Sequence, residues 1–164
     1  MNFFSGKTIL VTGATGLIGS NLIDTLMKIE GVKVIALSLT EEKLKRSFKK
    51  YIGNENFRYI ARDISLGLED IEETIDICFH AAGSTEGSKV SNYPVDIIMP
   101  NLIGIKNCCD FMVSQYKNKK IKGRLILFSS ATIYANNTNE DLVVKEEDTN
   151  YTEALNGNNA SYSQ

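Results

Sequence analysis

The sequence predicts an α/β fold built on a doubly wound parallel sheet. Short apolar runs alternate with amphipathic stretches along the 164 residues, a spacing typical of right-handed βαβ units. The first apolar run leads straight into a glycine-rich turn, as in sheets that bind a ligand at the carboxyl ends of their strands. The length fits one domain, so we expect residues 1–164 to form a single unit.

The glycine-rich turn follows a short apolar run, Ile9–Val11, that reads as a buried strand. Gly13, Gly16 and Gly19 recur every three residues. The first glycine permits a sharp turn, the second a close approach of backbone to a phosphate, and the third close packing of helix on strand. The amides at the start of the helix then form a seat for a pyrophosphate. The same spacing also suits a tight strand-to-helix turn without a ligand.

The first half of the chain alternates strand and helix. Apolar residues at helical spacing predict a helix over 17–29, with Leu17 and Ile18 on its apolar face. Thr40 is the expected N-cap of a second helix over 40–50. The strands of this half are expected at residues 9–11, 32–37 and 57–61.

The second half continues the alternation. A short acidic helix is expected over 68–74, before a strand over 76–80. A long helix is expected over 95–116, with Pro94 in its first turn, and Pro100 predicts a kink or a later start. The remaining segments are a polar stretch over 85–93, a fifth strand over 124–128 and a long surface loop from residue 135.

Composition argues against nucleic-acid and membrane partners. The formal net charge is −2, and no apolar run reaches the roughly 18 residues of a membrane span. The N-terminus lacks the basic region and long apolar core of a secretory signal. Cys78, Cys108 and Cys109 lack C-x-x-C spacing, so we expect reduced, mostly buried thiols and no metal site. The protein is therefore expected to be cytoplasmic.

Parallel strands bring their carboxyl ends to one edge of a sheet. The residues that fall at the ends of the expected strands are Gly13, Ser38, Asp63, Ala81 and Ser130. Ser38 stands where an acid would bind the ribose 2′-hydroxyl of NAD, or where a nearby Arg would accommodate the 2′-phosphate of NADP. Neither diagnostic residue is present, and Lys43 or Arg46 is within reach of a phosphate, so NAD and NADP both remain open. These positions predict a Rossmann-type dinucleotide-binding domain with strand order 3-2-1-4-5.

Several motifs resemble those of the extended short-chain dehydrogenase/reductase family, the nucleotide-sugar epimerases and dehydratases. Thr12-Gly-Ala-Thr-Gly-Leu-Ile-Gly19 is similar to the T-G-x-x-G-x-x-G dinucleotide motif of this family. Arg62-Asp-Ile64 is similar to its D-[LIV] element, whose acid contacts the adenine in relatives. His80-Ala-Ala-Gly83 is similar to its H-x-A-A segment, which lines the cofactor.

Two later motifs extend the resemblance. Asn101-Leu-Ile-Gly104 resembles N-x-x-G-T except at Ile105, where the family has Thr. Ser129-Ser-Ala-Thr-Ile-Tyr134 is similar to the S-S-A-T-V-Y run of epimerases, with Ala135 where Gly is usual. Five motifs in the family's order are specific, although each one is loose.

The resemblance implies a Ser/Thr-Tyr-Lys catalytic set. Ser130 is the hydroxyl that would bind the substrate oxygen, and Tyr162 opens what looks like Y-x-x-x-K. The sequence stops two residues before the expected lysine, which in relatives binds the nicotinamide ribose and lowers the pKa of the tyrosine. We therefore expect an N-terminal fragment that lacks the substrate domain and is inactive by itself. Ala131 and Thr132 stand where the 4,6-dehydratases carry Asp-Glu, which argues against dehydration.

The residues expected to hold the dinucleotide are Gly13, Thr15, Gly16, Leu17, Ile18, Gly19, Ser38, Asp63, Ile64, Ala81, Ala82, Gly83 and Asn101. Several of them have simpler interpretations: Asp63 as turn chemistry after a strand, Asn101 as a helix cap near a proline. His80 is the only histidine and is expected to be structural.

The resemblance implies the NAD(P)-binding portion of a nucleotide-sugar epimerase-like enzyme, with transient hydride transfer at a sugar carbon. It slightly favours NAD as the cofactor and implies a nucleotide-sugar substrate in the full-length protein. The alternatives are a nucleotide-sugar decarboxylase, a carbonyl reductase on the same scaffold, or an inert dinucleotide-binding fragment. A hydrophobic sheet edge left unpaired after the fifth strand would favour a homodimer.

Overall fold

The computed structural model describes residues 2–83, 94–129 and 145. The chain divides into one unit formed by Met1–Gly83 and Met99–Phe128 and a second formed by Ser84–Ile98 and Ser129–Gln164. The first unit contains the whole sheet and nearly all of the described residues. The expected polar stretch over 85–93 and the loop from 135 lie outside the described residues, except at Lys145.

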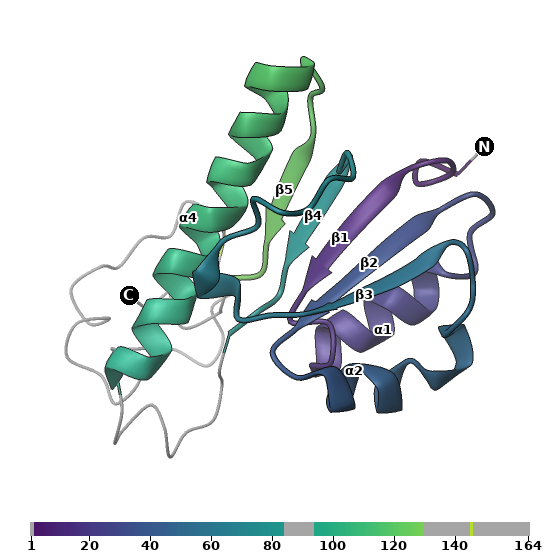
Figure 1. Ribbon diagram of the computed structural model, residues 1–164, viewed down its shortest axis with the longest axis horizontal. Helices are drawn as coiled ribbons and strands as arrows, with labels where there is room; N and C mark the ends of the chain where they lie inside the picture. Colours follow the sequence, from purple (N-terminus) through teal and green to yellow (C-terminus); the bar gives the residue numbers. More distant parts are fainter. Residues whose placement is uncertain (1, 84–93, 130–144, 146–164) are drawn as a thin grey trace. The chain divides into compact units, whose positions relative to one another are not determined.

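The five strands form one sheet in the order β3-β2-β1-β4-β5, and every neighbouring pair is parallel (Figure 1). They are β1 (Thr8–Thr12), β2 (Lys33–Ser38), β3 (Phe57–Ala61), β4 (Ile77–His80) and β5 (Arg124–Leu127). The predicted order and the Rossmann-type fold class are confirmed. In the centre of the sheet, Leu10 of β1 pairs with Ile35 on one side and with Cys78 on the other.

Helices cover both faces of this sheet. The helical elements are α1 (Leu17–Leu26), α2 (Glu41–Ser47), the 3₁₀ turns η1 (Lys49–Tyr51) and η2 (Ile64–Leu66), and α4 (Pro94–Lys119). Ile9 and Val11 of β1 pack in one cluster with residues of α1 and α2, whereas Leu10 packs with Cys108 and Met112 of α4. Successive strand residues point to opposite faces, so each face has its own core. No helix in the described ranges is long and apolar enough to cross a membrane.

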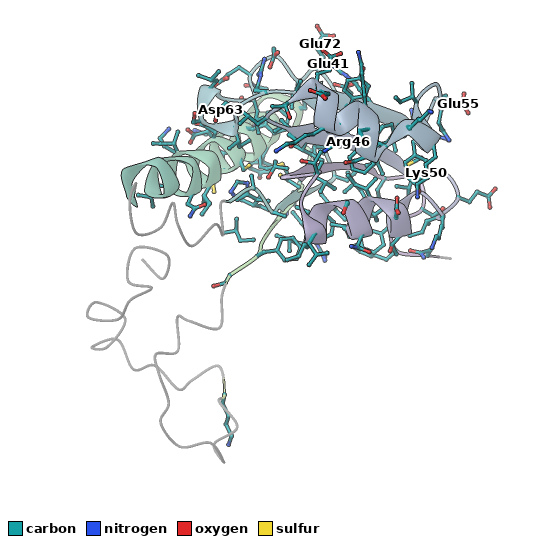
Figure 2. All side chains as sticks on the ribbon, turned by 90° about the horizontal axis from the view of Figure 1, so that it is seen from below. Glu41, Arg46, Lys50, Glu55, Asp63 and Glu72 are labelled. Atoms are coloured by element: carbon teal, nitrogen blue, oxygen red, sulfur yellow. The ribbon has the colours of Figure 1, made fainter. Side chains whose placement is uncertain are left out.

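The second helix is shorter than predicted. It ends at Ser47, and η1 follows it as a separate 3₁₀ turn. Thr40 stands at the N-cap, but its side chain makes no capping hydrogen bond. Glu41 in the first turn and Arg46 in the last turn complement the helix dipole instead (Figure 2).

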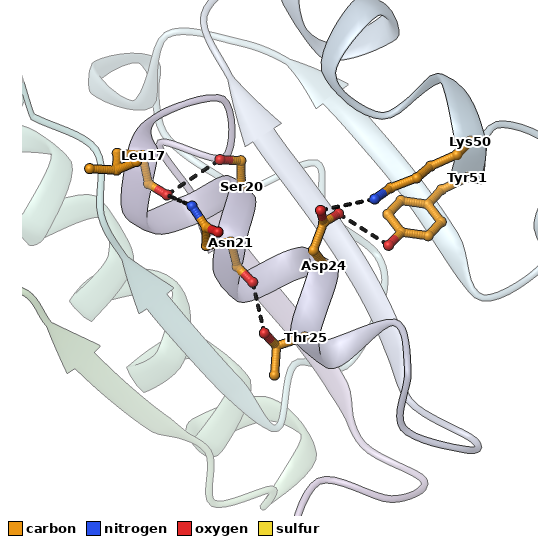
Figure 3. Close-up of polar contacts among 7 residues, drawn as sticks. All are labelled: Leu17, Ser20, Asn21, Asp24, Thr25, Lys50 and Tyr51. Atoms are coloured by element: carbon orange, nitrogen blue, oxygen red, sulfur yellow. Dashed lines mark hydrogen bonds and ion pairs between the residues drawn. The ribbon is translucent and has the colours of Figure 1, made fainter.

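The first helix ends at Leu26, three residues before the predicted end. Polar contacts connect the outer side of α1 to η1. The Asp24 carboxylate of α1 accepts hydrogen bonds from Lys50 Nζ at 2.9 Å and from Tyr51 Oη at 3.1 Å, both in η1 (Figure 3). The predicted apolar face was wrong at Leu17 and Ile18, which are 83% and 51% exposed. The first turn of the helix leaves the core, because the helix begins at the carboxyl edge of the sheet.

The predicted helix over 68–74 is wrong, since these residues form a turn, two bends and irregular backbone. Gly67, at φ +89°, ends η2 in a conformation that breaks the helical path. The Arg62 guanidinium donates to the Gly67 carbonyl and pairs with Asp70. These contacts hold the backbone of residues 67–70 in its non-helical conformation after η2. Leu68, Ile71 and Ile75 are buried against α4, and their spacing imitates a helical face.

The long helix α4 begins at Pro94, so Pro94 stands in the first turn as predicted and Pro100 does not delay the start. Its inner side includes Cys108 and Met112, both buried. Gln115 is also buried, and its side-chain amide bonds both backbone groups of Ile75: Ile75 N donates to Oε1 at 2.7 Å, and Nε2 donates to Ile75 O at 2.8 Å. The Gln115 amide thereby attaches the helix to the connection before β4.

Candidate functional site

The glycine turn after β1 packs directly on the end of β4. Gly13 has φ +63°, and a Cβ added there would lie 2.3 Å from the Ala81 carbonyl oxygen. The backbone of the turn is also bonded to β2, because the Ala14 N–H donates to the Leu37 carbonyl at 3.0 Å. Only glycine fits at position 13, both for backbone strain and for space.

The two later glycines differ in what surrounds them. A Cβ at Gly19 would lie 2.5 Å from Gly13 O, so the absence of a side chain lets α1 pack on the turn. A Cβ at Gly16 would meet only Gly13 O, at 3.2 Å, so the space in front of Gly16 is open. The first turn of α1 contains no acidic residue, and its backbone N–H groups have no intrahelical acceptors. Open space in front of backbone amides without intrahelical acceptors suits the binding of an anionic phosphate group.

Two hydroxyls meet where β2 ends. Thr15 Oγ1 of the glycine turn and Ser38 Oγ lie 2.8 Å apart, in hydrogen-bond contact. The Arg62 N–H donates to the Ser38 carbonyl at 2.8 Å, so the end of β3 lies beside them. The Arg62 guanidinium, however, is engaged by Asp70 and by Gly67 O.

Asp63 and Ile64 follow β3. The Asp63 Oδ1 atom accepts hydrogen bonds from Ser65 N at 2.9 Å and from Ser65 Oγ at 2.8 Å, as the N-cap of η2. Both bonds go to the same carboxylate oxygen. Ile64 is buried, and its carbonyl accepts a hydrogen bond from Asn107 Nδ2 of α4 at 2.8 Å. The turn chemistry considered for Asp63 is therefore present in the structure.

A buried polar group joins β1 to β4. Thr12 Oγ1 lies 2.8 Å from His80 Nδ1 and accepts a hydrogen bond from Ala82 N at 3.3 Å. Cys108 Sγ of α4 lies 3.5 Å from the same imidazole nitrogen. A hydrogen bond from Cys78 and the nearby His80 lower the pKa of the Cys108 thiol to about 6.

The segment after β4 contacts α4 at Asn101. A Cβ at Gly83 would lie 3.0 Å from Asn101 Oδ1, so the amide of Asn101 packs on this segment. The segment also carries Ala82, whose N–H is bound to Thr12. Asn101 therefore contacts the backbone predicted to line the cofactor.

The structure brings the expected dinucleotide residues to the carboxyl edge of the sheet or to its flanking segments: Gly13, Thr15, Gly16, Leu17, Ile18, Gly19, Ser38, Asp63, Ile64, Ala81, Ala82, Gly83 and Asn101. Ser130 and Tyr162 lie outside the described residues. Within the described part of the chain, no group of three or more His, Cys, Asp or Glu residues is placed to hold a metal ion.

Sequence reasoning missed two contributors to this edge. The sequence predicts Cys108 only as a reduced thiol, and the structure places its Sγ 3.5 Å from His80 Nδ1. Gly104 belongs to the Asn101–Gly104 motif, and a Cβ there would lie 3.1 Å from His80 Cε1 and 2.9 Å from Ile64 Cγ2. A glycine inside an otherwise regular helix is the signal that marks such a close approach.

Comparison with known proteins adds to the geometry. The model of the NAD dependent epimerase/dehydratase family matches residues 9–164. UDP-glucuronic acid decarboxylase 6 of Arabidopsis thaliana is 32% identical over 132 residues, which cover 80% of this chain and 36% of that protein. UDP-glucuronic acid decarboxylase 1 of Danio rerio is 30% identical over 128 residues, covering 78% of this chain and 28% of that protein.

A solved structure is similar over nearly the whole chain. It is the UDP-N-acetylglucosamine 4-epimerase from Methanobrevibacter ruminantium M1 in complex with UDP-N-acetylmuramic acid, with a TM-score of 0.69 and 25% identity, covering 96% of this chain and 48% of that chain. The present chain spans about a third of the two decarboxylases and about half of the epimerase. Since the family model matches from the first strand onward, the chain belongs to the NAD dependent epimerase/dehydratase family.

Proposed function

We propose that this chain binds NAD at the carboxyl edge of its sheet, as the cofactor-binding part of a nucleotide-sugar epimerase-like enzyme. The observation that carries the proposal is the glycine turn. Gly13 packs on Ala81 with no room for a side chain, while the space in front of Gly16 stays open before the first turn of α1. The match to the family model over residues 9–164 supports the same assignment.

Each part of the dinucleotide has matching residues in this proposal. The turn amides hold the pyrophosphate, and the Thr15 and Ser38 hydroxyls receive the adenosine ribose. Asp63 and Ile64 contact the adenine. The full set is completed by Leu17, Ile18 and Gly19 at the start of α1 and by Ala81, Ala82, Gly83 and Asn101 along the nicotinamide half.

We propose NAD rather than NADP as the cofactor, with support from the surroundings of Ser38. A 2′-phosphate needs a free cation. The backbone N–H of Arg62 bonds the Ser38 carbonyl, but the Arg62 guanidinium is engaged by Asp70 and Gly67 O, which leaves Lys43 and Arg46 as the cations that would have to reach such a phosphate. Calorimetric titration with each dinucleotide tests the preference. Ser38→Asp is expected to raise the ratio of NAD affinity to NADP affinity roughly tenfold, because the new carboxylate repels the 2′-phosphate of NADP. Tighter binding of NADP by the parent chain would contradict the assignment.

The proposed reaction begins with oxidation at a sugar carbon. Tyr162 accepts the proton of a sugar hydroxyl while Ser130 donates a hydrogen bond to its oxygen. The bound dinucleotide supplies the hydride acceptor. In an epimerase the hydride then returns to the other face of the sugar carbon, so the product is the epimer and no net oxidation occurs. Both residues carry these roles by motif position, in the whole protein.

A decarboxylase is the second candidate, because the relative that is 32% identical is a UDP-glucuronic acid decarboxylase. Product analysis separates the two. The protein is incubated with NAD and either UDP-glucose or UDP-glucuronic acid, and the sugars are identified by NMR. An epimer supports the first candidate, and a pentose with released CO₂ supports the second. No conversion by a protein that binds NAD supports the inert dinucleotide-binding fragment.

We also propose a cytoplasmic location, since all three cysteines are free thiols and a reducing compartment keeps them so. A homodimer is proposed on the apolar edge strand of the sheet, whose Ile126 and Leu127 are 37% and 47% exposed.

A further inference from the structure

The helix α4 is hydrogen-bonded to η2, the short turn that follows β3. The side-chain amide nitrogen of Asn107 in α4 donates to the Ile64 carbonyl oxygen at 2.8 Å, although the two residues are 43 positions apart. A carbonyl oxygen can only accept, so the amide must present its NH₂ group to Ile64. The contact therefore requires a donor at position 107.

The helix comes this close to η2 because Gly104 has no side chain. A Cβ at Gly104 would lie 2.9 Å from Ile64 Cγ2, so a larger residue there would force the turn and the helix apart. Gly104 and Asn107 are three positions apart and so lie on the same side of α4. Ile64 is 5% exposed and packs in one cluster with Cys108 and Met112 of the same helix. Both the backbone and the side chain of Ile64 are therefore held by α4.

The carboxylate next to Ile64 belongs to the same turn. Asp63 is the N-cap of η2, and its Oδ1 atom accepts hydrogen bonds from both the N–H and the hydroxyl of Ser65. Neither bond uses Oδ2, which keeps its lone pairs for another donor. The position of this carboxylate depends on where α4 holds the turn, because Asp63 directly precedes Ile64.

We propose that Asn107 is a positioning residue that holds η2 on α4 and so places the Asp63 carboxylate beside the 6-amino group of the dinucleotide's adenine. This inference rests on the proposed function, in which Asp63 and Ile64 contact the adenine. The 6-amino group of adenine donates and a carboxylate oxygen accepts, so the two match. Hypoxanthine has an oxygen in place of that amino group, and the carboxylate repels it. Asn107 thus acts on the choice of base through Asp63.

Two variants of Asn107 remove the donor. Asn107→Asp keeps the shape of the side chain but presents a carboxylate, which cannot donate and repels the Ile64 carbonyl. Asn107→Leu keeps a branched side chain of similar size without polar atoms. Asn118→Asp makes the same chemical change on the same helix, at an exposed amide that donates to Ser114 Oγ at 3.2 Å, and is the matched control.

The first measurement follows amide hydrogen exchange in η2 and needs no dinucleotide. The Ser65 N–H donates to Asp63 Oδ1 and the Leu66 N–H to the Asp63 carbonyl, so their exchange reports how firmly the turn is held. Roughly tenfold faster exchange is expected in Asn107→Asp and Asn107→Leu, and no change in Asn118→Asp. Unchanged exchange in both Asn107 variants would overturn the proposal.

The second measurement compares affinity for NAD with affinity for nicotinamide hypoxanthine dinucleotide, by calorimetric titration. The parent and Asn118→Asp are expected to prefer NAD roughly tenfold, since only adenine donates to the Asp63 carboxylate. Asn107→Asp and Asn107→Leu are expected to lose most of this preference. A role in stability alone would weaken both dinucleotides equally and leave the preference unchanged, and that result would overturn the proposal.

The third measurement tests whether Asn107 acts through Asp63. Asp63→Asn keeps an oxygen for Ser65 and presents an NH₂ group as the second atom, so it is expected to prefer hypoxanthine. Asn107→Leu should then lower the preference for NAD in the parent and raise it in Asp63→Asn, because both preferences need residue 63 in place. A shift in the same direction in both backgrounds would overturn the proposal.

The failure of this inference is distinguishable from the failure of the proposed function. A parent that prefers NAD, with Asn107 variants that keep the preference, would overturn the positioning role and leave NAD binding intact. A folded parent that binds neither dinucleotide would overturn the proposed function, and the positioning role with it. The result expected is NAD binding by the parent and by every variant, with the preference for adenine lost in Asn107→Asp and Asn107→Leu.

Discussion

Gly13 shows how one missing side chain decides the geometry of the site. Gly13 and Gly53 both adopt positive φ, +63° and +88°, so alanine is strained at either position. They differ in surroundings: a Cβ at Gly13 meets the backbone of residues 81 and 82, whereas a Cβ at Gly53 has nothing within 4 Å. Alanine substitutions at these two positions therefore separate the cost of backbone strain from the cost of a steric clash with the segment after β4.

Gly53→Ala is expected to cost about 1 kcal/mol of unfolding free energy, from strain alone. Gly13→Ala is expected to cost roughly 3 kcal/mol, because overpacking adds to the same strain. It should also weaken NAD binding, since the segment after β4 must move. Urea unfolding of both variants measures the difference. Equal costs would mean that the turn does not depend on its contact with Ala81.

Gln115 carries a prediction at the scale of elements, the attachment of α4 to the connection before β4. Its side-chain amide bonds both the N–H and the carbonyl of Ile75, at 2.7 and 2.8 Å. Gln115→Leu leaves both backbone groups buried without partners, so we expect a loss of about 2–4 kcal/mol of unfolding free energy. Asn118→Ala on the same helix, where the exposed amide bonds Ser114, is the control and should change little. Similar losses in the two variants would contradict this attachment.

The contact between Asp24 of α1 and residues of η1 predicts that the free energy of unfolding depends on pH. The Lys50 ammonium, and after it the Tyr51 hydroxyl, lower the pKa of Asp24. A carboxyl whose folded pKa lies below its unfolded value, about 3.9, stabilises the fold above that pH and loses this effect as the pH falls through the folded pKa. Because Asp24 is 43% exposed, the contribution is below about 1 kcal/mol.

Thermal unfolding of the parent chain and of Asp24→Asn measures this contribution. The parent is expected to be slightly more stable at about pH 7, and the difference should shrink as the pH falls through the lowered folded pKa of Asp24 and the carboxyl becomes protonated in both states. Added salt at neutral pH should also reduce the difference. A difference that persists unchanged in acid would show that the charge of Asp24 plays no part.

The edge strand β5 carries the prediction at the scale of the whole molecule. Ile126, Leu127 and Phe128 are 37%, 47% and 42% exposed and follow one another along this edge. An exposed apolar strand edge promotes association. Ile126→Lys is therefore expected to reduce self-association measured by analytical ultracentrifugation, whereas Ile52→Lys, at a side chain 49% exposed and outside the sheet, should not. Equal association of parent and Ile126→Lys would contradict an interface at β5.

The sheet was predictable because its signals are local. The β1 residues Ile9 to Val11 are all 0% exposed, so a run buried on both faces appears as a continuous apolar run in the sequence. The helix over 68–74 was wrong for a related reason. Leu68 and Ile71 are buried at helical spacing, but Gly67 at φ +89° and the Arg62–Asp70 pair impose another course.

The site was predictable where it depends on the glycine turn and the ends of strands. Its polar contacts were not, because they join residues far apart along the chain. Thr12 and His80 are 68 positions apart, and His80 and Cys108 are 28 apart. No local pattern carries such a pairing. The tertiary packing of β1, β4 and α4 creates it.

Calorimetric titration with NAD of the parent chain and of Gly16→Asp is the most direct test of the dinucleotide site. A Cβ at position 16 would meet only Gly13 O, at 3.2 Å, so we expect the variant to fold with its carboxylate in the space proposed for the pyrophosphate. We predict one-site binding of NAD by the parent chain and none by the variant. A folded parent that binds no NAD, or a variant that binds it equally well, would contradict the site.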